Sequence, residues 1–565
     1  MNKDDIFEIE IEDLGNDGEG IGHVDGMTIF VKDLCPGDVA KVKIIKAKKN
    51  YCYGRAMEII KPSKQRVEAK CPVARQCGGC VLQHLSYEEQ LRRKDKKVRD
   101  CLSRIGGIKD IDSYMEPPVG MEDPYHYRNK MQFPVRRNKE GKCVVGFYAG
   151  RTHSIIPVDS CVIGHSVNDN IIKAVKAFVD KFNISCYDEL TGKGFLRHIL
   201  TRVGFTTNEL MVCLIVNGES LPHKEVFTEM INDAVAEYNI AADKKDDNFK
   251  EIILKSIVIN INKEKTNRIL GFNSKTIYGD GFITDYIGDV KFMISPESFF
   301  QVNPVQTVKL YSKALEYAAL TGNETVWDMY CGIGTISLFL SDKAKKVYGV
   351  EIVPQAIIDA KKNAKLNNRD NIEFYTGKAE DVVTEIYEKK VEGSTADVVC
   401  VDPPRKGCDE KLLNTIISMA PKRVVYVSCD PATLARDVKF LSEHGYELKK
   451  AVAFDQFSHS MHVETCVLLS HQQVKKSVTI DYTPDGSYMK NVNRHATYKE
   501  INEYVENKYG FKLHSAFIAQ VKREMGIEMG ENYNLSKSDD YEPREVTPEK
   551  RAAIIDALRH FNMIE

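Results

Sequence analysis

The chain has 565 residues, 43% of them hydrophobic and 28% charged, which is the composition of a globular protein of about three or four domains. A formal net charge of −2 excludes a polycation, so any nucleic-acid contact must come from a local positive surface. No apolar run reaches the ~20 residues of a membrane helix and no secretory signal opens the chain, so we expect a cytoplasmic protein without membrane contact.

Residues 1–62 predict a small β-barrel of the OB type. Strand-like runs separated by glycine turns cover three stretches: 6–14, 27–32 and 38–60. A basic run at 46–49 lies beside Tyr51 and Tyr53. Cations that follow phosphates and rings that stack on bases suit single-stranded RNA, although a solvated hairpin tip would have the same sequence.

Residues 63–293 predict a central α+β region that binds RNA. Apolar residues at helical spacing indicate a helix over about 87–102, and its basic run 92–99 is either solvated helix surface or an RNA contact. Two further segments combine cations with aromatic residues. They give the candidate substrate contacts Arg128, Lys130, Arg197 and His198, for which an ordinary strand with polar flanks is the alternative.

Three cysteines, Cys71, Cys77 and Cys80, form a C-x5-C-x2-C cluster around a pair of glycines. Fifteen cysteines spread over so long a chain do not indicate a disulfide framework. A fourth ligand is needed, and Cys161 is the best candidate. Three close cysteines and one remote cysteine suit a [4Fe–4S] cluster, with a zinc site as the alternative.

Residues 294–472 alternate apolar strands with helices, which predicts a doubly wound, Rossmann-like α/β domain with a largely parallel sheet. The expected strands are 325–329, 346–351, 372–375, 398–402, 423–428 and 462–470, with helical segments between them. Residues 473–565 predict a separate tail of three short helices, either a helix-turn-helix-like module or a packing appendage. Thr497 with Glu500, Ser515, and Thr547 before Pro548 are its expected helix starts.

A glycine-containing turn at 328–335 joins one of these strands to a helix. Gly332 and Gly334 let the backbone approach a ligand at the carboxyl edge of the sheet, unless they form a structural turn only. The segment lacks the third glycine of a dinucleotide fingerprint, and S-adenosylmethionine has no phosphate that would require it. Glu351 ends the next strand and Asp402 the fourth, so the pattern favours S-adenosylmethionine over NAD.

Reactive side chains follow other strands of the same domain. Cys429 follows the fifth strand and is a candidate nucleophile, whereas most strand-end cysteines are buried and inert. Glu464, in the last strand, is a candidate base. A thiolate that adds to C6 of uracil activates C5 toward a methyl donor, and a base must then remove the C5 proton. Arg405, with its neighbour Lys406, could lower the thiol pKa or offset the charge of the enolate, and Arg405 is a further candidate substrate contact.

Four motifs carry a resemblance to a known family: Asp-Pro-Pro-Arg at 402–405, Ser-Cys-Asp-Pro at 428–431, His-Val-Glu-Thr at 462–465, and Ser-Phe-Phe-Gln-Val-Asn at 298–303. The chain resembles the RNA uracil-5 methyltransferases over about residues 1–470, most closely the bacterial 23S ribosomal RNA members with a TRAM-type barrel. The resemblance implies that Gln301, Tyr330, Glu351 and Asp402 contact S-adenosylmethionine. It also implies a nucleophilic Cys429, a basic Glu464 and an iron–sulfur cluster on the four cysteines.

The expected function is therefore methylation of C5 of a uridine in 23S ribosomal RNA. The expected partner is structured RNA in which that uridine is extruded from its stack, and the expected state is a monomer. A tRNA uridine methyltransferase is one alternative. A non-catalytic RNA-binding or chaperone protein on the same scaffold is another, although the intact Cys429 and Glu464 speak against it.

Overall fold

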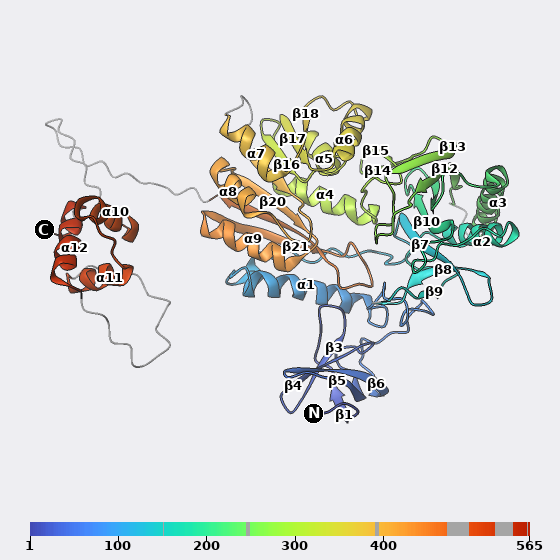
Figure 1. The fold of residues 1–565 in the computed structure, drawn as a ribbon, viewed down its shortest axis with the longest axis horizontal. Helices are drawn as coiled ribbons and strands as arrows, with labels where there is room; N and C mark the ends of the chain where they lie inside the picture. Colours follow the sequence, from blue (N-terminus) through green and yellow to red (C-terminus); the bar gives the residue numbers. More distant parts are fainter. Residues whose placement is uncertain are drawn as a thin grey trace. The chain divides into compact units, whose positions relative to one another are not determined.

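The computed structural model describes residues 1–150, 152–244, 249–389, 395–471, 497–525, 546–561 and 563–564. It divides into two compact units, residues 1–473 and 474–565 (Figure 1). Across these described ranges, every helix is too short or too polar to cross a membrane.

The N-terminal barrel has six strands in the order β1-β5-β6-β4-β3-β2. They are β1 (Ile6–Glu10), β2 (Asp13–Leu14), β3 (Gly20–Val24), β4 (Met27–Val31), β5 (Val39–Ala47) and β6 (Tyr51–Lys61). Gly20 and Gly22 lie inside β3, although glycines in this stretch were expected in turns. A Cβ on Gly22 would approach Ile9 Cγ2 to 2.4 Å, and one on Gly20 would approach Ile11 Cγ2 to 2.9 Å. The two glycines therefore let β3 pack closely against the first strand.

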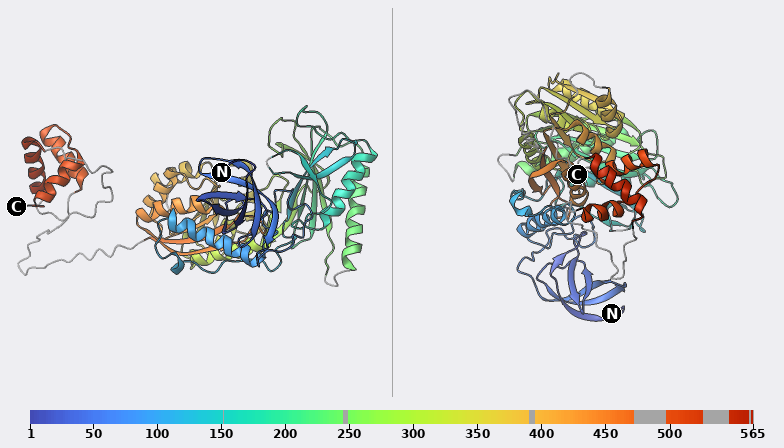
Figure 2. Two further views of the ribbon diagram at one scale, coloured as in Figure 1. Left: turned by 90° about the horizontal axis from the view of Figure 1, so that it is seen from below. Right: turned by 90° about the vertical axis from the view of Figure 1, so that its left-hand side faces the viewer.

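The central region is a seven-stranded sheet in the order β13-β12-β11-β10-β7-β8-β9. Its strands are β7 (Lys130–Arg137), β8 (Cys143–Tyr148), β9 (Ile155–Pro157), β10 (Leu196–Val203), β11 (Glu209–Val216), β12 (Ile253–Ile261) and β13 (Asn273–Gly279). Helices α2 (Val167–Lys181) and α3 (Lys224–Asp243) lie side by side on one face of this sheet (Figure 2). The hairpin β14 (Ile283–Ile287) and β15 (Val290–Ile294) leads on to the last domain of this unit.

The third sheet has the order β18-β17-β16-β19-β20-β22-β21, and its first five strands are parallel. Its strands are β16 (Thr325–Met329), β17 (Lys346–Glu351), β18 (Ile372–Thr376), β19 (Val398–Val401), β20 (Arg423–Ser428), β21 (Tyr446–Phe454) and β22 (Glu464–His471). Its helices are α4 (Pro304–Ala318), α5 (Thr335–Ser341), α6 (Pro354–Leu366), α7 (Ala379–Glu388), α8 (Glu410–Met419) and α9 (Pro431–Glu443). The predicted strands are confirmed.

Strand β21 was not expected, because the stretch between β20 and β22 reads as helical in the sequence. The structure places helix α9 there and then β21, which pairs antiparallel with β22. The register of this pair shifts between Leu448 and Lys450. That irregularity interrupts the period-two alternation by which a half-buried strand is recognised.

Helix α1 (Tyr87–Arg104) confirms the predicted helix and lies beside α9 and β21 (Figure 1). Its cations are engaged within the protein. Arg93 pairs with Glu89 and Asp13, and the side chains of Lys96 and Arg99 also bond to aspartates. The basic run therefore stabilises the helix and its contact with the barrel, and RNA would have to displace these carboxylates to use it.

A buried carboxylate, Asp455, attaches helix α1 to the loop that precedes β22. Lys94 and Asp455 form an ion pair in which both side chains are only 1% exposed. The Tyr87 hydroxyl donates to Asp455 Oδ2 at 2.7 Å, and so does the Ser458 hydroxyl at 2.7 Å. The Lys94 ammonium also donates to the Phe457 carbonyl at 2.9 Å. The loop is thus held at several points by one helix.

The second unit contains α10 (Tyr498–Tyr509), α11 (Ser515–Glu524) and α12 (Pro548–His560), which share an apolar core. The capping box of Thr497 and Glu500 is confirmed, and Thr547 precedes α12 as expected. The cap expected at Ser515 is wrong by one residue. His514 is the N-cap, and its ring nitrogen accepts a bond from the Ala516 N–H at 3.3 Å.

Removing one partner of the buried pair should destabilise the protein strongly, because the other charge would remain buried without compensation. We expect Lys94→Met or Asp455→Asn each to lower the free energy of unfolding by about 3–5 kcal/mol, and the double variant to cost less than the sum. Urea unfolding measures this. Lys41→Met, which breaks the exposed pair with Glu58, is the control and should cost less than about 1 kcal/mol. Strictly additive single effects would contradict the coupling.

Candidate active site

One cavity of about 1060 Å³ lies at the carboxyl ends of the parallel strands of the third sheet. The ends of β16, β17, β19 and β20, the start of β22 and the segment after β15 all contribute to its wall. Most of the predicted cofactor and catalytic residues line it: Gln301, Tyr330, Gly332, Glu351, Asp402, Cys429 and Glu464. The edge of the sheet thus gathers residues that are up to 163 positions apart in the chain.

Cys429 and Glu464 are brought together by the pairing of two antiparallel strands. Ser428, the last residue of β20, is paired with Thr465 in β22. Cys429 follows Ser428 and Glu464 precedes Thr465, so the thiol and the carboxyl lie at the same end of the ladder. Cys429 is half-buried, and Glu464 is 4% exposed.

Two buried acids of the cavity have pKa values that are raised close to neutral pH. Burial, and then the neighbouring Asp402, raises the pKa of Glu464 to about 8. The pKa of Asp402 is raised to about 7 by burial and by Asp328. The pKa of the Cys429 thiol is raised to about 11, first by burial and then by the Glu464 carboxyl. Arg405 acts in the opposite direction but does not outweigh burial. The predicted effect of Arg405 on the thiol is thus present, but burial and the carboxyl groups outweigh it and the net pKa is raised.

The carboxylate of Glu351 is fixed at the end of β17 by two backbone groups. Gly332 N–H donates to Oε2 at 3.2 Å and Val353 N–H donates to Oε1 at 2.8 Å. Tyr330, just after β16, has a positive φ of 72°. A tyrosine in the left-handed region is strained, and such strain is retained where the surrounding structure requires one backbone path. Here that path turns the chain around the floor of the cavity.

The two glycines of this turn differ in their surroundings. Gly332 has a φ of 55° and open space where a Cβ would lie, and it belongs to the cavity wall. A Cβ on Gly334 would lie 3.0 Å from Phe374 Cζ, and Gly334 is the N-cap of α5 outside the cavity lining. The structure thus places Gly332 beside the open cavity and Gly334 in the packing of a helix start.

Several lining residues were not predicted from the sequence. Helix α6 contributes Gln355 and Asp359. Two exposed aromatic rings, Phe272 and Phe299, also belong to the wall. Phe299 lies in a quoted motif and could have been found from it. The others are adjacent only through folding.

Of the predicted RNA contacts, the structure places some in the wall of the cavity and others outside it. Arg405 is exposed and lines the cavity. Arg128 and Lys130 lie outside the lining, but Asn129 between them donates to the Gln301 carbonyl at 2.9 Å. Burial, and then the cations of Arg202 and Arg128, lowers the pKa of Lys130 to about 7. The positive form of Lys130 is therefore disfavoured at this position beside two arginines.

Arg197 and His198 do not reach the cavity, which corrects their interpretation as substrate contacts at this site. Arg197 is 4% exposed, stacks on the Tyr187 ring at 4.1 Å, and donates to the carbonyls of Asn262 and Glu264, each at 2.8 Å. His198 is 5% exposed, and burial lowers its pKa to about 4. Both belong to the interior of the central sheet.

The four predicted metal ligands share one neighbourhood without forming a finished site. The thiols of Cys161, Cys77 and Cys71 act electrostatically on Cys80, whose pKa is raised to about 12 mainly by burial. Among the described residues, no group of three or more His, Cys, Asp and Glu side chains is arranged to hold a metal ion. The predicted metal centre is thus not supported as a preassembled site.

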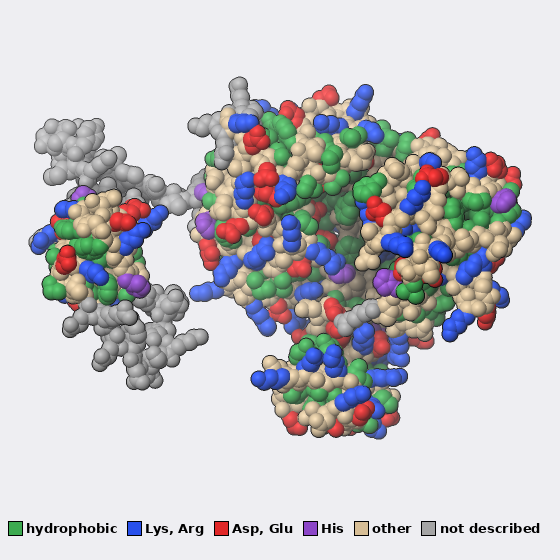
Figure 3. Space-filling view, viewed as in Figure 1, with side chains coloured by type: hydrophobic (Ala, Val, Ile, Leu, Met, Phe, Trp, Pro, Cys, Tyr) green, Lys and Arg blue, Asp and Glu red, His purple; other side chains and the backbone are tan. Residues whose placement is uncertain are grey.

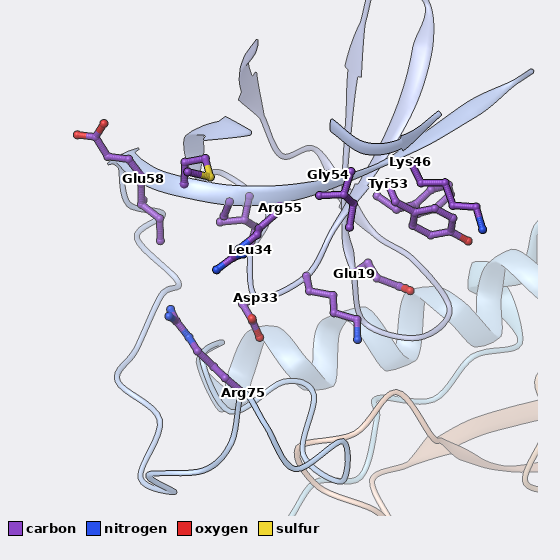
Figure 4. Close-up of a pocket in the computed structure, with 15 residues that line it drawn as sticks. Glu19, Asp33, Leu34, Lys46, Tyr53, Gly54, Arg55, Glu58 and Arg75 are labelled. Carbon is purple, nitrogen blue, oxygen red and sulfur yellow. The ribbon is translucent and has the colours of Figure 1, made fainter. Parts of the chain in front are cut away.

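A second cavity, of about 1010 Å³, lies on the barrel (Figure 4). Tyr53 and Lys46 lie at one end of it, and Arg75 approaches from the cysteine-rich segment below Asp33 and Arg55 (Figure 4). Lysine and arginine side chains are spread over the visible face of the barrel (Figure 3). Three aromatic rings stand together beside this cavity: Phe30, Tyr51 and Tyr53, with ring centroids 5.7–5.9 Å apart.

This arrangement matches a known family of RNA-modifying enzymes. The family model for tRNA (uracil-5-)-methyltransferase matches residues 86–472, and the TRAM domain model matches residues 5–57. The chain belongs to the tRNA (uracil-5-)-methyltransferase family and carries an N-terminal TRAM domain. The predicted family resemblance is confirmed.

Similar proteins include an uncharacterized RNA methyltransferase of Bacillus cereus, 52% identical over 470 residues, which are 83% of this chain and 97% of that protein. Another, from Halalkalibacterium halodurans, is 50% identical and covers 83% of this chain and 98% of its own length. The crystal structure of Pyrococcus abyssi tRNA (uracil-54, C5)-methyltransferase with S-adenosyl-L-homocysteine matches with a TM-score of 0.63 and 29% identity, over 82% of this chain and 100% of that one.

Proposed function

We propose that this protein transfers a methyl group from S-adenosylmethionine to C5 of a uridine in 23S ribosomal RNA, by way of a covalent bond between Cys429 and C6. The observation that carries the proposal is the pairing of β20 with β22, which sets the Cys429 thiol and the Glu464 carboxyl at one end of the ladder, in one cavity. A nucleophile and a base that reach C6 and the C5 proton of the same pyrimidine ring are what this chemistry requires.

The reaction balances with these two side chains. The Cys429 thiolate adds to C6, and the electrons of the C5–C6 double bond move toward the O4 enolate. S-adenosylmethionine, when bound, would supply the electrophilic methyl group to C5, with the sulfonium–methyl bond broken and S-adenosylhomocysteine left as the neutral thioether. Glu464 then removes the proton from C5, the C5–C6 double bond re-forms, and the Cys429–C6 bond breaks to release the thiolate.

The electrostatics of the cavity suit these roles. A carboxylate whose pKa is raised to about 8 is a stronger proton acceptor than an ordinary glutamate, which favours Glu464 as the base. Arg405 is the cation that lowers the pKa of Cys429, and it could also offset the charge on the enolate. The resting thiol is protonated at neutral pH, so loss of its proton must accompany attack on C6.

The residues around the cavity fit S-adenosylmethionine. Glu351 has both carboxylate oxygens held by backbone N–H groups and stands ready to accept the ribose hydroxyls. The open space beside Gly332 leaves room for the ligand along the backbone. We assign Gln301, Tyr330 and Asp402 to the remaining contacts. The Pyrococcus abyssi protein, which matches over its whole length, was crystallised with S-adenosyl-L-homocysteine.

Two features support ribosomal RNA as the substrate: the TRAM barrel with its aromatic and basic cavity, and the cysteine-rich segment that sends Arg75 toward it. A tRNA substrate is the second candidate, and it is favoured by the activity in the name of the Pyrococcus abyssi enzyme. A purely RNA-binding role does not account for the nucleophile and base that share the cavity. We propose that the enzyme acts as a monomer, with Arg128 and Lys130 close to the RNA.

The cysteine-rich segment is proposed to hold a [4Fe–4S] cluster on Cys71, Cys77, Cys80 and Cys161. The donor set fits, because the thiols of Cys71, Cys77 and Cys161 act electrostatically on Cys80, which makes four thiols in one neighbourhood. A Cβ at Gly79 would meet only the Cys77 sulfur, at 3.6 Å, so this part of the loop leaves room. The methyl transfer involves no redox step, so we propose a structural role for the cluster. Its four iron–thiolate bonds would fix the fold of this segment.

The RNA target is tested by mass mapping of ribosomal RNA and tRNA from cells that lack this gene. We expect 5-methyluridine to disappear from one or two positions of 23S ribosomal RNA, and to return with the wild-type gene but not with Cys429→Ala. Cys466→Ala, which removes a buried strand cysteine outside the cavity lining, is the matched control and should restore the mark. Loss of the mark from tRNA alone would reassign the substrate and leave the chemistry intact.

Replacing the base should interrupt the reaction after the covalent bond has formed. We expect Glu464→Gln to accumulate a methylated RNA–protein adduct, because the C5 proton stays in place and the thiolate cannot leave. A denaturing gel with radiolabelled RNA measures this. Adding Cys429→Ala should abolish the adduct. Normal turnover by Glu464→Gln without an adduct would contradict the assignment of the base.

The cluster is tested on protein purified without oxygen. We expect close to four iron and four sulfide per chain together with a broad visible absorption, and loss of both in Cys77→Ser or Cys161→Ser. Cys101→Ser, outside the cysteine-rich segment, should retain them. If the protein contains one zinc ion per chain and no iron, the four cysteines form a zinc site instead. Metal-free protein with full activity would exclude both the cluster and the zinc site.

A further inference from the structure

An exposed aromatic ring stands at the wall of the active-site cavity without a role in the proposed reaction. The Phe272 side chain is 73% exposed and lines the cavity together with Arg268. The Arg268 guanidinium lies over the Phe272 ring, 3.8 Å from its centroid. One face of the ring is thus occupied by a cation, while most of the side chain remains open to solvent.

The loop that presents this pair is held by two buried asparagines, Asn260 in β12 and Asn262 just after the end of that strand. Asn260 is fully buried. Its carbonyl oxygen accepts the Gly271 N–H at 2.6 Å, and its amide donates to the Gly271 carbonyl at 3.2 Å. Asn262 is 2% exposed and donates to the carbonyls of Arg268 and Ile269 at 2.7 and 2.9 Å. These two side chains thus provide hydrogen-bond partners for loop backbone groups that have no partner within the loop.

The same asparagines connect the loop to the rest of the site. The Asn260 amide also donates to Glu297 Oε1 at 3.1 Å, and Glu297 lies just before the motif that carries Phe299 and Gln301. Arg197, which was expected to contact RNA, instead donates to the carbonyls of Asn262 and Glu264 beneath the loop. The backbone of the loop that carries the exposed ring is therefore held by several side-chain hydrogen bonds, which is one way in which a binding surface is preorganised.

We propose that Phe272, backed by Arg268, is a stacking platform for the RNA base next to the target uridine. The inference rests on the proposed function. Extruding a uridine from its stack leaves a neighbouring base with one uncovered face, and an exposed ring at the mouth of the cavity can cover it. Stacking on a ring tolerates any base, and the cation behind the ring adds its attraction to the π face.

The proposal is tested with a synthetic RNA hairpin that spans the mapped uridine, by measuring RNA affinity and methylation in parallel. Phe272→Ala should weaken RNA binding and raise KM for RNA by roughly tenfold, the usual loss of one base–aromatic stack. Because the reacting groups are untouched, kcat should change less than about twofold. Phe272→Trp should restore both values. Leu190→Ala removes another exposed apolar side chain, outside the cavity lining, and should have no effect.

A double-mutant cycle separates stacking from indirect effects. An abasic residue placed in turn on each side of the target uridine should weaken binding to the wild-type protein at one position. At that position it should add little to the loss caused by Phe272→Ala. Independent losses at every position, or wild-type affinity of Phe272→Ala, would overturn the platform. A wild-type protein that binds the hairpin but never methylates it would count against the proposed function instead.

Discussion

The buried carboxylate of Asp455 is the interaction on which the geometry of the site depends. It accepts bonds from Lys94 and Tyr87 of helix α1 and from Ser458 of its own loop. Through these bonds an early segment of the chain, far from the catalytic strands in sequence, fixes the loop that leads into β22. Without that anchor the loop would carry several polar groups into an apolar interior, and the first residue of β22 would lose its fixed position.

Acidic groups in and behind the cavity have pKa values close to neutral pH. Asp402 and Glu464 line the cavity and Asp328 lies behind it in β16, and burial is the main cause that raises their pKa values to between about 7 and 8. Each raised pKa means that the folded chain disfavours the charged carboxylate, so the site is poised to exchange protons near neutral pH. The same burial keeps Cys429 as a thiol between turnovers. A resting thiol is less open to oxidation than a thiolate, which suits a cysteine that must act repeatedly.

The sequence predicted the catalytic edge well, because strand–helix alternation forces the ends of parallel strands to one side of the sheet. Cys429, Glu464, Glu351 and Asp402 could be located from that rule and their residue types. It could not separate Gly332 from Gly334, whose roles differ only in what lies beside them. Nor could it show that Arg197 points inward, because the carbonyls that hold it come from a loop 65 residues away. Burial and non-local hydrogen bonds decided these cases.

The antiparallel pairing of β20 and β22 sets the separation between the nucleophile Cys429 and the base Glu464. Loops tolerate insertions and deletions, and their ends shift accordingly. The register of two paired strands can change only by whole residues, and a slip by one residue would turn every side chain of β22 to the opposite face. The separation of nucleophile and base is therefore inherited from the hydrogen-bond spacing of the sheet. The nucleophile and the base therefore keep their spacing as long as this register is kept, while the buried loop anchored by Asp455 fixes where β22 begins.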